Sequence, residues 1–132
     1  MSTTIVIMID GLDPEYLSVC PAPRLEELAK SGSRFNVRGL MPSVTNVNNV
    51  SLVTGSYPEN HGITSNYWLD RDRESEHYME SAEYIKSETM FQRADGLGMR
   101  SLLVTAKDKL RRLLSTGTTC LLYTSPSPRD RG

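Results

Sequence analysis

The stretch VTNVNNVSLVTG, residues 44–55, combines an apolar stripe with a polar beginning. Val47, Val50 and Val53 recur at a spacing close to the period of an α-helix. Thr45 stands where such a helix would be capped, and small polar residues surround it. The pattern predicts a core helix whose polar N-terminus is either an ordinary turn or a place where chemistry occurs.

The elements expected on either side of this helix alternate between strands and helices. Residues 4–9, TIVIMI, are continuously apolar and are expected to form a strand that is buried on both faces. The full set comprises strands at 4–9, 34–40 and 100–105, helices at 23–30, 45–54, 87–97 and 107–114, a loop at 56–62 and a polar hairpin at 67–79. This order predicts an α/β sandwich with a mostly parallel central sheet.

Length, composition and charge are those of one globular domain. The chain has 132 residues, 38% apolar residues and a formal net charge of −1, so nothing points to nucleic acid or an anionic membrane as a partner. Cys20 and Cys120 lack the spacing of a zinc knuckle or a disulfide framework. The apolar run at 5–9 is too short for a signal peptide core or a membrane span, so the expected location is the cytoplasm.

The C-terminal sequence CLLYTSPSPRDRG, residues 120–132, differs sharply in composition from the rest of the chain. A disordered tail is the simpler interpretation. The order of its residues also resembles the translation of a sequencing-library adapter. We therefore expect residues 1–119 to be the native N-terminal part of a longer protein, and residues 120–132 to be a non-native, disordered tail.

Asp10 directly follows the first expected strand. In a parallel α/β sheet, ligands bind at the carboxyl ends of the strands, where a carboxylate can hold a metal ion. An equally open alternative is that Asp10 caps the turn that leads into Asp13 and Pro14.

Thr45 and Asn48 occupy the beginning of the expected core helix. A helix N-terminus favours an anion such as phosphate, and a threonine hydroxyl can attack phosphorus when a metal ion activates it. Asn48, one turn on, could direct an amide N–H toward a phosphoryl oxygen. The alternatives are an N-cap threonine and an asparagine that makes ordinary surface hydrogen bonds.

Three segments resemble the alkaline phosphatase superfamily and, within it, the phosphonoacetate hydrolases, which are neighbours of the nucleotide pyrophosphatase/phosphodiesterases. They are MIDGLDPEYL (8–17), MPSVTNVNNVSLVTGSYPENHGITSN (41–66) and LLVTAKDKLRRLL (102–114). The Asn-x-Asn-Asn sequence after Thr45 and the TAKDKLR segment narrow the resemblance to phosphonoacetate hydrolase. Pyrophosphatase/phosphodiesterases usually have Phe-Pro-Asn after the threonine, where this chain has Asn46-Val47-Asn48. The resemblance covers nearly all of residues 4–114 and implies an alkaline phosphatase-like fold, of which this chain is the N-terminal part.

The resemblance implies a role for particular residues. Asp10 matches a metal-binding aspartate, and Thr45 matches a nucleophile that also ligates one of two zinc ions. Asn66 matches an asparagine that contacts the substrate phosphonate, and Lys107 and Lys109 match lysines that bind its carboxylate. A solvated basic helix start is the alternative for the two lysines. His61 is not expected to bind zinc, because it lies alone in a structural loop.

The implied reaction is hydrolysis of the P–C bond of phosphonoacetate to phosphate and acetate. The remaining zinc ligands lie farther along the chain in this family, so we expect the 132-residue piece to bind zinc poorly and to be inactive. Two alternatives stay open: a pyrophosphatase/phosphodiesterase-like enzyme that splits a P–O bond, and a non-catalytic anion-binding α/β module. The expected partner is a small phosphonate or phosphate ester, and a homodimer of the full-length protein is left open.

Overall fold

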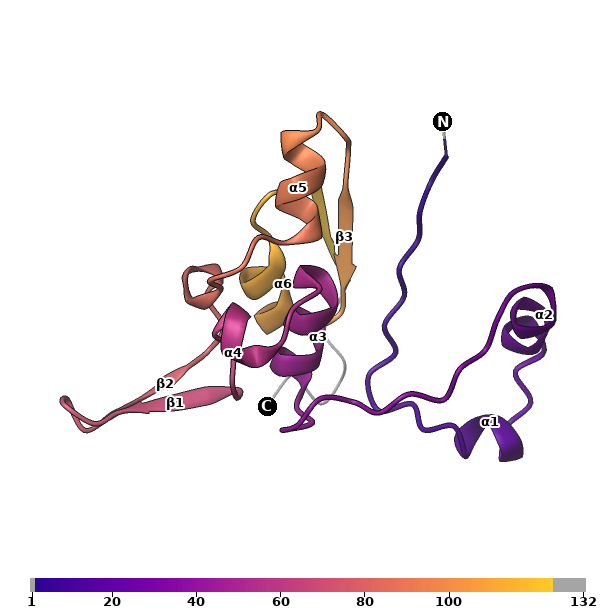
Figure 1. Cartoon of the computed structure of the whole chain (residues 1–132), viewed down its shortest axis with the longest axis horizontal. Coiled ribbons are helices and arrows are strands. Elements are labelled where there is room, and N and C mark those ends of the chain that lie inside the picture. The colour runs from indigo at the N-terminus through magenta and orange to yellow at the C-terminus, as the bar shows by residue number, and fades with distance from the viewer. Residues whose placement is uncertain (1, 125–132) are drawn as a thin grey trace. The chain divides into compact units, whose positions relative to one another are not determined.

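The computed structural model describes residues 2–124. The chain divides into two compact units, Met1–Gly39 and Leu40–Gly132, which are described one at a time (Figure 1). No helix among the described residues is long and apolar enough to cross a membrane.

The first unit contains two short helices, α1 (Tyr16–Val19) and α2 (Pro23–Ser31). Helix α2 was predicted from its ends, and the structure confirms both of them. Pro23 lies in the first turn, where a backbone N–H would have no partner within the helix, so proline loses no hydrogen bond there. At the other end, the N–H of Gly32 donates to the carbonyl of Leu28.

The strands predicted at 4–9 and 34–40 do not form in the described structure. Both segments are extended and exposed, with Ile7 76% and Phe35 80% exposed. Apolar, β-branched residues favour an extended backbone, but a strand exists only when a neighbour accepts and donates its hydrogen bonds. The prediction that residues 4–9 are buried on both faces is therefore wrong for this structure.

The second unit holds the remaining elements. They are α3 (Thr45–Thr54), α4 (Pro58–His61), β1 (Tyr67–Asp70), β2 (Ser75–Tyr78), the 3-10 helix η1 (Ala82–Tyr84), α5 (Met90–Gly96), β3 (Leu102–Thr105), α6 (Asp108–Leu114) and β4 (Cys120–Tyr123). Helix α4 lies in the segment that was predicted to be a loop, because Pro58 starts one helical turn there. Helix α5 starts later than predicted, since Thr89 rather than Ser87 forms its capping box with Gln92.

Two small sheets form in this unit. Strands β1 and β2 pair antiparallel, with Tyr67 opposite Tyr78, which confirms the predicted hairpin. Strands β3 and β4 pair in parallel, with Leu103 opposite Leu121, and α6 connects them along the chain. This β–α–β unit is the parallel part of the mixed α/β fold.

Strand β4 corrects the prediction for the C-terminal tail. Cys120–Tyr123 were expected to be disordered, but their backbone pairs with β3 in register from Leu102 to Thr105. The apolar residues of this short stretch suit a strand whose neighbour is already in place. Residues 125–132 lie outside the described part of the chain, and the adapter origin of the tail stays a prediction.

Helices α3 and α6 supply most of the core of the second unit. Val47 and Val50 from α3 and Leu113 from α6 are each 0% exposed, and Ile63 and Met79 complete the cluster with their neighbours. Burying one such side chain stabilises a fold by about 1.5–3 kcal/mol. The valine stripe predicted from residues 44–55 is therefore confirmed as the core face of α3.

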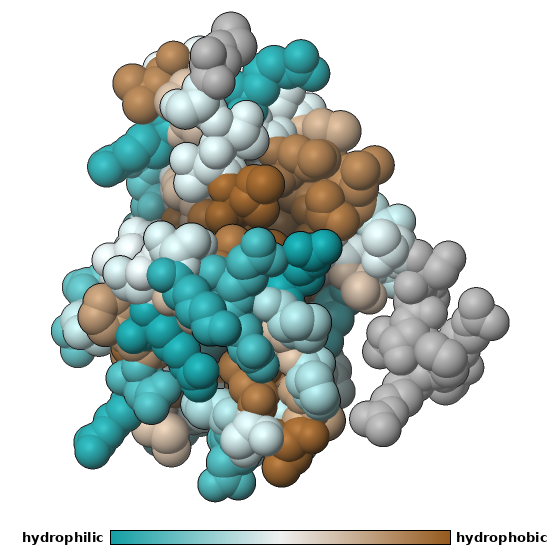
Figure 2. Space-filling view, turned by 90° about the vertical axis from the view of Figure 1, so that its right-hand side faces the viewer, coloured by the Kyte–Doolittle hydropathy of each residue, from teal (hydrophilic) through white to brown (hydrophobic). Residues whose placement is uncertain are grey.

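Large apolar side chains also remain at the surface of this unit. Leu102, Val104 and Leu122 alternate with inward residues along β3 and β4 and are each more than half exposed. Exposed apolar side chains are not confined to this unit, since Ile5, Ile7 and Phe35 of the first unit are exposed as well. Figure 2 shows apolar side chains gathered on the face that it draws. A contiguous apolar surface, in contrast to scattered apolar residues, usually marks a place where a partner or ligand binds.

Candidate active site

Thr45 is the first residue of α3 rather than its cap. The N-cap is Val44, which is extended with φ −119° and ψ 156° and has no side chain that could cap. In the turn before α3, the N–H of Val44 donates a hydrogen bond to the carbonyl of Pro42 at 2.8 Å. Thr45 is half-buried at this N-terminus. The alternative of an N-cap threonine is therefore excluded, and the hydroxyl stands in the first turn, where an anion is favoured.

Asn66 lies at the same end of α3, although 20 residues separate it from Asn46. Its Oδ1 accepts a hydrogen bond from the backbone N–H of Asn46 at 3.3 Å. Its carbonyl accepts the N–H of Met79 at 2.8 Å, which closes the base of the β1–β2 hairpin. The structure therefore brings two of the predicted site residues, Thr45 and Asn66, to one place, and the amide nitrogen of Asn66 is the group that can donate to a ligand.

Asn48 braces the loop before α3. Its Oδ1 accepts the N–H of Leu40 at 3.0 Å, and its Nδ2 donates to the carbonyls of Val44 at 3.3 Å and Leu40 at 3.5 Å. Both ends of the amide thus hold residues 40–44, the segment that leads to Thr45. The substrate-binding role of Asn48 stays a prediction, and these contacts give the side chain a different task.

Lys107 and Lys109 flank the start of α6, at the carboxyl end of β3. Lys107 is the N-cap residue, and its N–H donates to Oγ1 of Thr105 at 3.1 Å. Both lysines are half-buried. The position agrees with the rule that ligands bind at the carboxyl ends of parallel strands.

The acid between the two lysines is engaged by arginines of the same helix. Asp108 pairs with Arg111 at 2.7 Å and with Arg112 at 3.4 Å. Arg112 also reaches Glu80, just after β2, at 2.7 Å. The two arginines therefore offset the charges of Asp108 and Glu80, and the two lysines on either side of Asp108 are further cationic groups of this corner.

Asp10 belongs to the first unit, in an exposed turn that continues through Gly11 at φ 76°. The turn that follows is capped by Asp13, whose Oδ1 accepts the N–H of Glu15 at 2.8 Å. Asp13 makes this cap, and the alternative that Asp10 also caps a turn here stays open. Its role as a metal ligand stays a prediction.

His61 is fully buried between α3 and the chain that follows α4. Its Nδ1 accepts the N–H of Ile63 at 3.1 Å, so the proton lies on Nε2, which is 2.8 Å from Oγ of Ser51. Burial lowers the pKa of this histidine below 6.5. A protonated Nε2 cannot act as a base toward Ser51, so the pair links two segments and is not a nucleophile with its base.

The described residues do not by themselves fit a zinc centre. Among residues 2–124, no three His, Cys, Asp or Glu side chains come together in a way that could hold a metal ion. A zinc ion in a protein takes three or four protein ligands, as a rule. Asp10 and Thr45 alone fall short of such a set.

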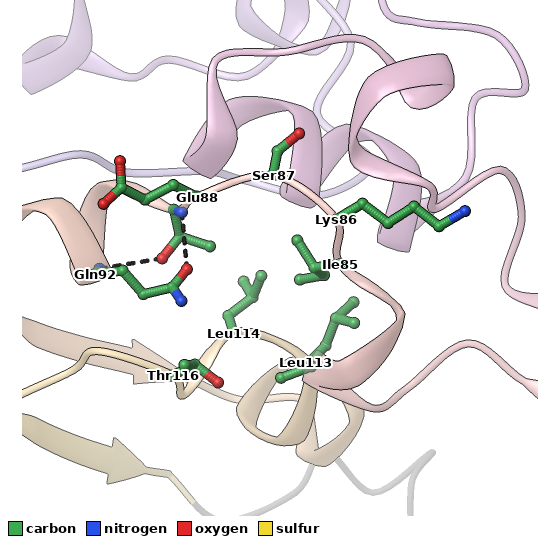
Figure 3. Close-up of a pocket in the computed structure, with 10 residues that line it drawn as sticks. Ile85, Lys86, Ser87, Glu88, Gln92, Leu113, Leu114 and Thr116 are labelled. Carbon is green, nitrogen blue, oxygen red and sulfur yellow. Dashed lines mark hydrogen bonds between the residues drawn. The ribbon is translucent and has the colours of Figure 1, made fainter.

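A cavity of about 260 Å³ lies away from the predicted site residues. Figure 3 shows Ile85, Leu113 and Leu114 at its base. Thr89 and Gln92 satisfy each other through the capping box, while the side chains of Lys86 and Glu88 extend away from the hollow. The cavity therefore lacks the convergent polar groups of a ligand site.

The chain belongs to the Type I phosphodiesterase / nucleotide pyrophosphatase family, whose model matches residues 4–121. Among solved structures, it is similar to phosphonoacetate hydrolase from Sinorhizobium meliloti 1021 in complex with phosphonoacetate. The TM-score is 0.71 at 37% identity, over 82% of this chain and 27% of that one. The same hydrolase in complex with phosphonoformate gives a TM-score of 0.70 at 38% identity, with the same coverage. These findings confirm the resemblance and the α/β fold class predicted from the sequence.

Curated relatives add pyrophosphatases and phosphodiesterases. A bis(5'-adenosyl)-triphosphatase enpp4 of Xenopus laevis is 37% identical over 76 residues, which are 57% of this chain and 17% of that protein. The human ectonucleotide pyrophosphatase/phosphodiesterase family member 1 is 32% identical over 106 residues, which are 74% of this chain and 12% of that protein. The chain thus spans less than a third of each of these proteins.

Asn46 is not among the residues that the sequence predicts for the site, although the structure places it beside Asn66. This residue shares a helical face with Val50 and Val53, at positions i, i+4 and i+7, so its burial could have been inferred from the spacing. Its contacts with Asn66 and Met79 join distant segments and leave no local signal.

Proposed function

We propose that this chain is the N-terminal part of a phosphonoacetate hydrolase, which splits the P–C bond of phosphonoacetate to give phosphate and acetate. The observation that carries the proposal is the similarity, at 37% identity over 82% of the chain, to a phosphonoacetate hydrolase in complex with phosphonoacetate. The proposal rests on the site residues as well as on the fold, because one fold serves many reactions.

Thr45 is the proposed nucleophile. Its half-buried position in the first turn of α3 places a hydroxyl where the helix N-terminus favours an anion. Attack of Oγ on phosphorus would form the phospho-threonine as the P–C bond breaks, and the leaving carbanion would take up a proton to become acetate. Water would then hydrolyse the phospho-threonine, which releases phosphate and restores the threonine hydroxyl. Asn66, held beside the same turn, would donate from its amide nitrogen to a phosphonyl oxygen.

Lys107 and Lys109 are the proposed carboxylate-binding residues. The substrate carries a negative charge at each end, so its two ends need separate partners. Both lysines lie at the start of α6, and arginines of the same helix engage Asp108, the acid between them. Two ammonium groups there would hold the carboxylate and stabilise the charge that develops on the leaving acetate.

Two zinc ions remain part of the proposal, with ligands additional to those that residues 2–124 contain. Threonine is a weak nucleophile at its own pKa, so some activating group is required. The resemblance to phosphonoacetate hydrolases implies that zinc would supply that activation. The 132-residue chain alone is therefore expected to bind zinc poorly and to show no turnover. The cytoplasmic location is a separate prediction that stays untested.

The second candidate is a pyrophosphatase/phosphodiesterase that splits a P–O bond. The description of the matching family and the human relative, which aligns with 74% of this chain, favour it. Substitution of the two lysines distinguishes the two candidate activities. Replacing both Lys107 and Lys109 with alanine should abolish phosphonoacetate cleavage and leave hydrolysis of bis(p-nitrophenyl) phosphate within about threefold, because an aryl diester has no carboxylate to bind.

The experiment that tests the proposal begins with the native gene, read past codon 119. If the reading frame continues, the full-length protein is purified and phosphate release from phosphonoacetate is measured with and without a chelator. Release that the chelator abolishes supports the proposal. Activity only on phosphodiesters would favour the second candidate. Phosphate binding that survives the chelator, without turnover of either substrate, would favour a non-catalytic anion-binding module.

A further inference from the structure

The residue directly after the proposed nucleophile makes contacts that reach across the second unit. Asn46 is 0% exposed, and its Nδ2 donates to the carbonyl of Met79 at 2.8 Å. Its backbone N–H donates to Oδ1 of Asn66 at 3.3 Å. The N–H of Met79 in turn donates to the carbonyl of Asn66 at 2.8 Å. These three hydrogen bonds form a closed ring, which we call the asparagine clamp.

We infer that Asn46 is a positioning residue: the asparagine clamp holds Asn66 at a fixed place relative to Thr45. The inference deepens the proposed function and rests on it for the roles of those two residues. Thr45 and Asn46 are consecutive residues of α3, whereas Asn66 and Met79 are the two ends of the β1–β2 hairpin. Two hydrogen bonds of Asn46, one from its side chain and one from its backbone N–H, therefore attach the hairpin to the helix start.

The orientation of Asn66 follows from the clamp. An amide side chain carries its acceptor oxygen and its donor nitrogen in one plane, on either side of the Cβ–Cγ bond. Because Oδ1 is held by the N–H of Asn46, the Nδ2 group is turned away from that contact and can donate elsewhere. A donor held in this way is preorganised for a phosphonyl oxygen, which is what makes such groups effective in catalysis.

The hydrogen bonding of Asn46 argues against a role in stability alone. Its Oδ1 is buried without a hydrogen-bond partner among the described residues, which is unfavourable for folding. An apolar side chain of similar volume would avoid this cost. Asn49 offers the contrast, since it is also buried but its Nδ2 donates to the carbonyl of Thr45 within the same helix. Only Asn46, of these two, joins the helix to another segment.

The test compares Asn46→Leu with Asn49→Leu as the matched control. Leucine keeps the branching and the number of side-chain heavy atoms of asparagine and removes the donor. The first measurement needs no activity: amide hydrogen exchange of Met79 by NMR in the 132-residue chain. We expect exchange at Met79 to be at least about tenfold faster in Asn46→Leu and to stay near wild type in Asn49→Leu, because only the first substitution releases the hairpin base.

The second measurement uses the full-length protein and phosphonoacetate. Asn46→Leu should lower kcat/KM about tenfold to a hundredfold at an unchanged melting temperature, which is the effect of a small misplacement of reacting groups. In an Asn66→Ala background the same substitution should have almost no further effect, because the residue that it positions is gone. A loss of folded protein would instead lower the activity equally in both backgrounds.

Each outcome decides the inference. Unchanged exchange at Met79, or equal effects with and without Asn66, would overturn it. An Asn46→Leu protein that fails to fold would also overturn it, because a positioning residue should tolerate an apolar side chain of similar size. If the full-length protein cleaves neither phosphonates nor phosphodiesters, the proposed function fails, while the exchange at Met79 still decides whether the clamp holds the hairpin.

Discussion

Residues 4–9 and helix α3 are both rich in β-branched apolar side chains, but they differ in what covers them. Ile5 and Ile7 are 77% and 76% exposed, whereas Val47 and Val50 are 0% exposed. Helix α3 packs with α6 in one cluster, and residues 4–9 form no strand in the described structure. Apolar β-branched side chains are therefore exposed in one segment and buried in the other.

The physical cause is where each segment finds its hydrogen-bond partners. A helix satisfies its backbone within ten consecutive residues, as α3 does from Thr45 to Thr54, and then needs only one apolar face to be covered. A strand needs a neighbouring strand for every second backbone group and a surface for its side chains. Composition alone cannot supply the neighbour.

Thr45→Ala should have the largest effect, because it tests whether the N-terminus of α3 is a reactive site in addition to a packed helix. In the full-length protein, phosphonoacetate cleavage should fall at least about a thousandfold, since no other hydroxyl takes the place of the nucleophile. Thr54→Ala is the matched control, because that hydroxyl lies at the other end of α3, where it donates to the carbonyl of Val50 and accepts from Oγ of Ser56. Retention of more than a tenth of the activity in Thr45→Ala would exclude Thr45 as the nucleophile.

Val50→Ala tests the packed side of the comparison. The side chain is fully buried, so its truncation removes apolar contacts and leaves a cavity. We expect the free energy of unfolding to fall by about 2 kcal/mol. Urea denaturation, followed by circular dichroism, measures this change. A loss below about 0.5 kcal/mol would mean that α3 does not pack in solution as it does here.

His61→Gln tests the link between α3 and the chain after α4 through pH. Burial lowers the pKa of His61 below 6.5, so the folded protein binds fewer protons than the unfolded chain in the window just below that value. The stabilisation is complete above pH 6.5 and is lost as the pH falls through the folded pKa.

The melting temperature of the wild type should therefore drop between pH 7.5 and pH 5, and His61→Gln should show a smaller drop. His77→Gln is the control, because that ring lies on the hairpin and stacks on Trp68. An equal pH dependence in all three proteins would show that His61 does not carry the effect.

Ile7→Ala should have the smallest effect. The side chain is 76% exposed, so its truncation should change the free energy of unfolding by less than about 0.5 kcal/mol. The same urea denaturation measures it. A loss of more than about 1 kcal/mol would show that residues 4–9 are covered in solution, and the contrast with α3 would then disappear.

Much of the candidate site could be predicted because its parts have local signals. Thr45, Asn66 and the two lysines stand in motifs that resemble a known family, and the similarity to solved structures confirms the family. Asn46 could not be found in this way. Its proposed role depends on a hydrogen bond to Met79, 33 residues away. Contacts between residues so far apart leave no repeating pattern in the sequence that would reveal them.

The sequence by itself determined the elements whose hydrogen bonds are local or nearly so. Helix α2 with its proline and glycine ends, the valine face of α3 and the hairpin of β1 and β2 all follow from spacing and turn residues. Each of these patterns carries its own partners within a few residues, so composition and order suffice to predict them.

Only the tertiary structure decided which segments meet. It paired Cys120–Tyr123 with β3, left residues 4–9 without a strand partner among the described residues, and joined Asn66 to the start of α3 through Asn46. The reason is that pairing between distant segments depends on surfaces that exist only after the local elements have packed. That packing brings Asn66 to the end of α3 where Thr45 lies, and the motif around Thr45 does not specify this neighbour.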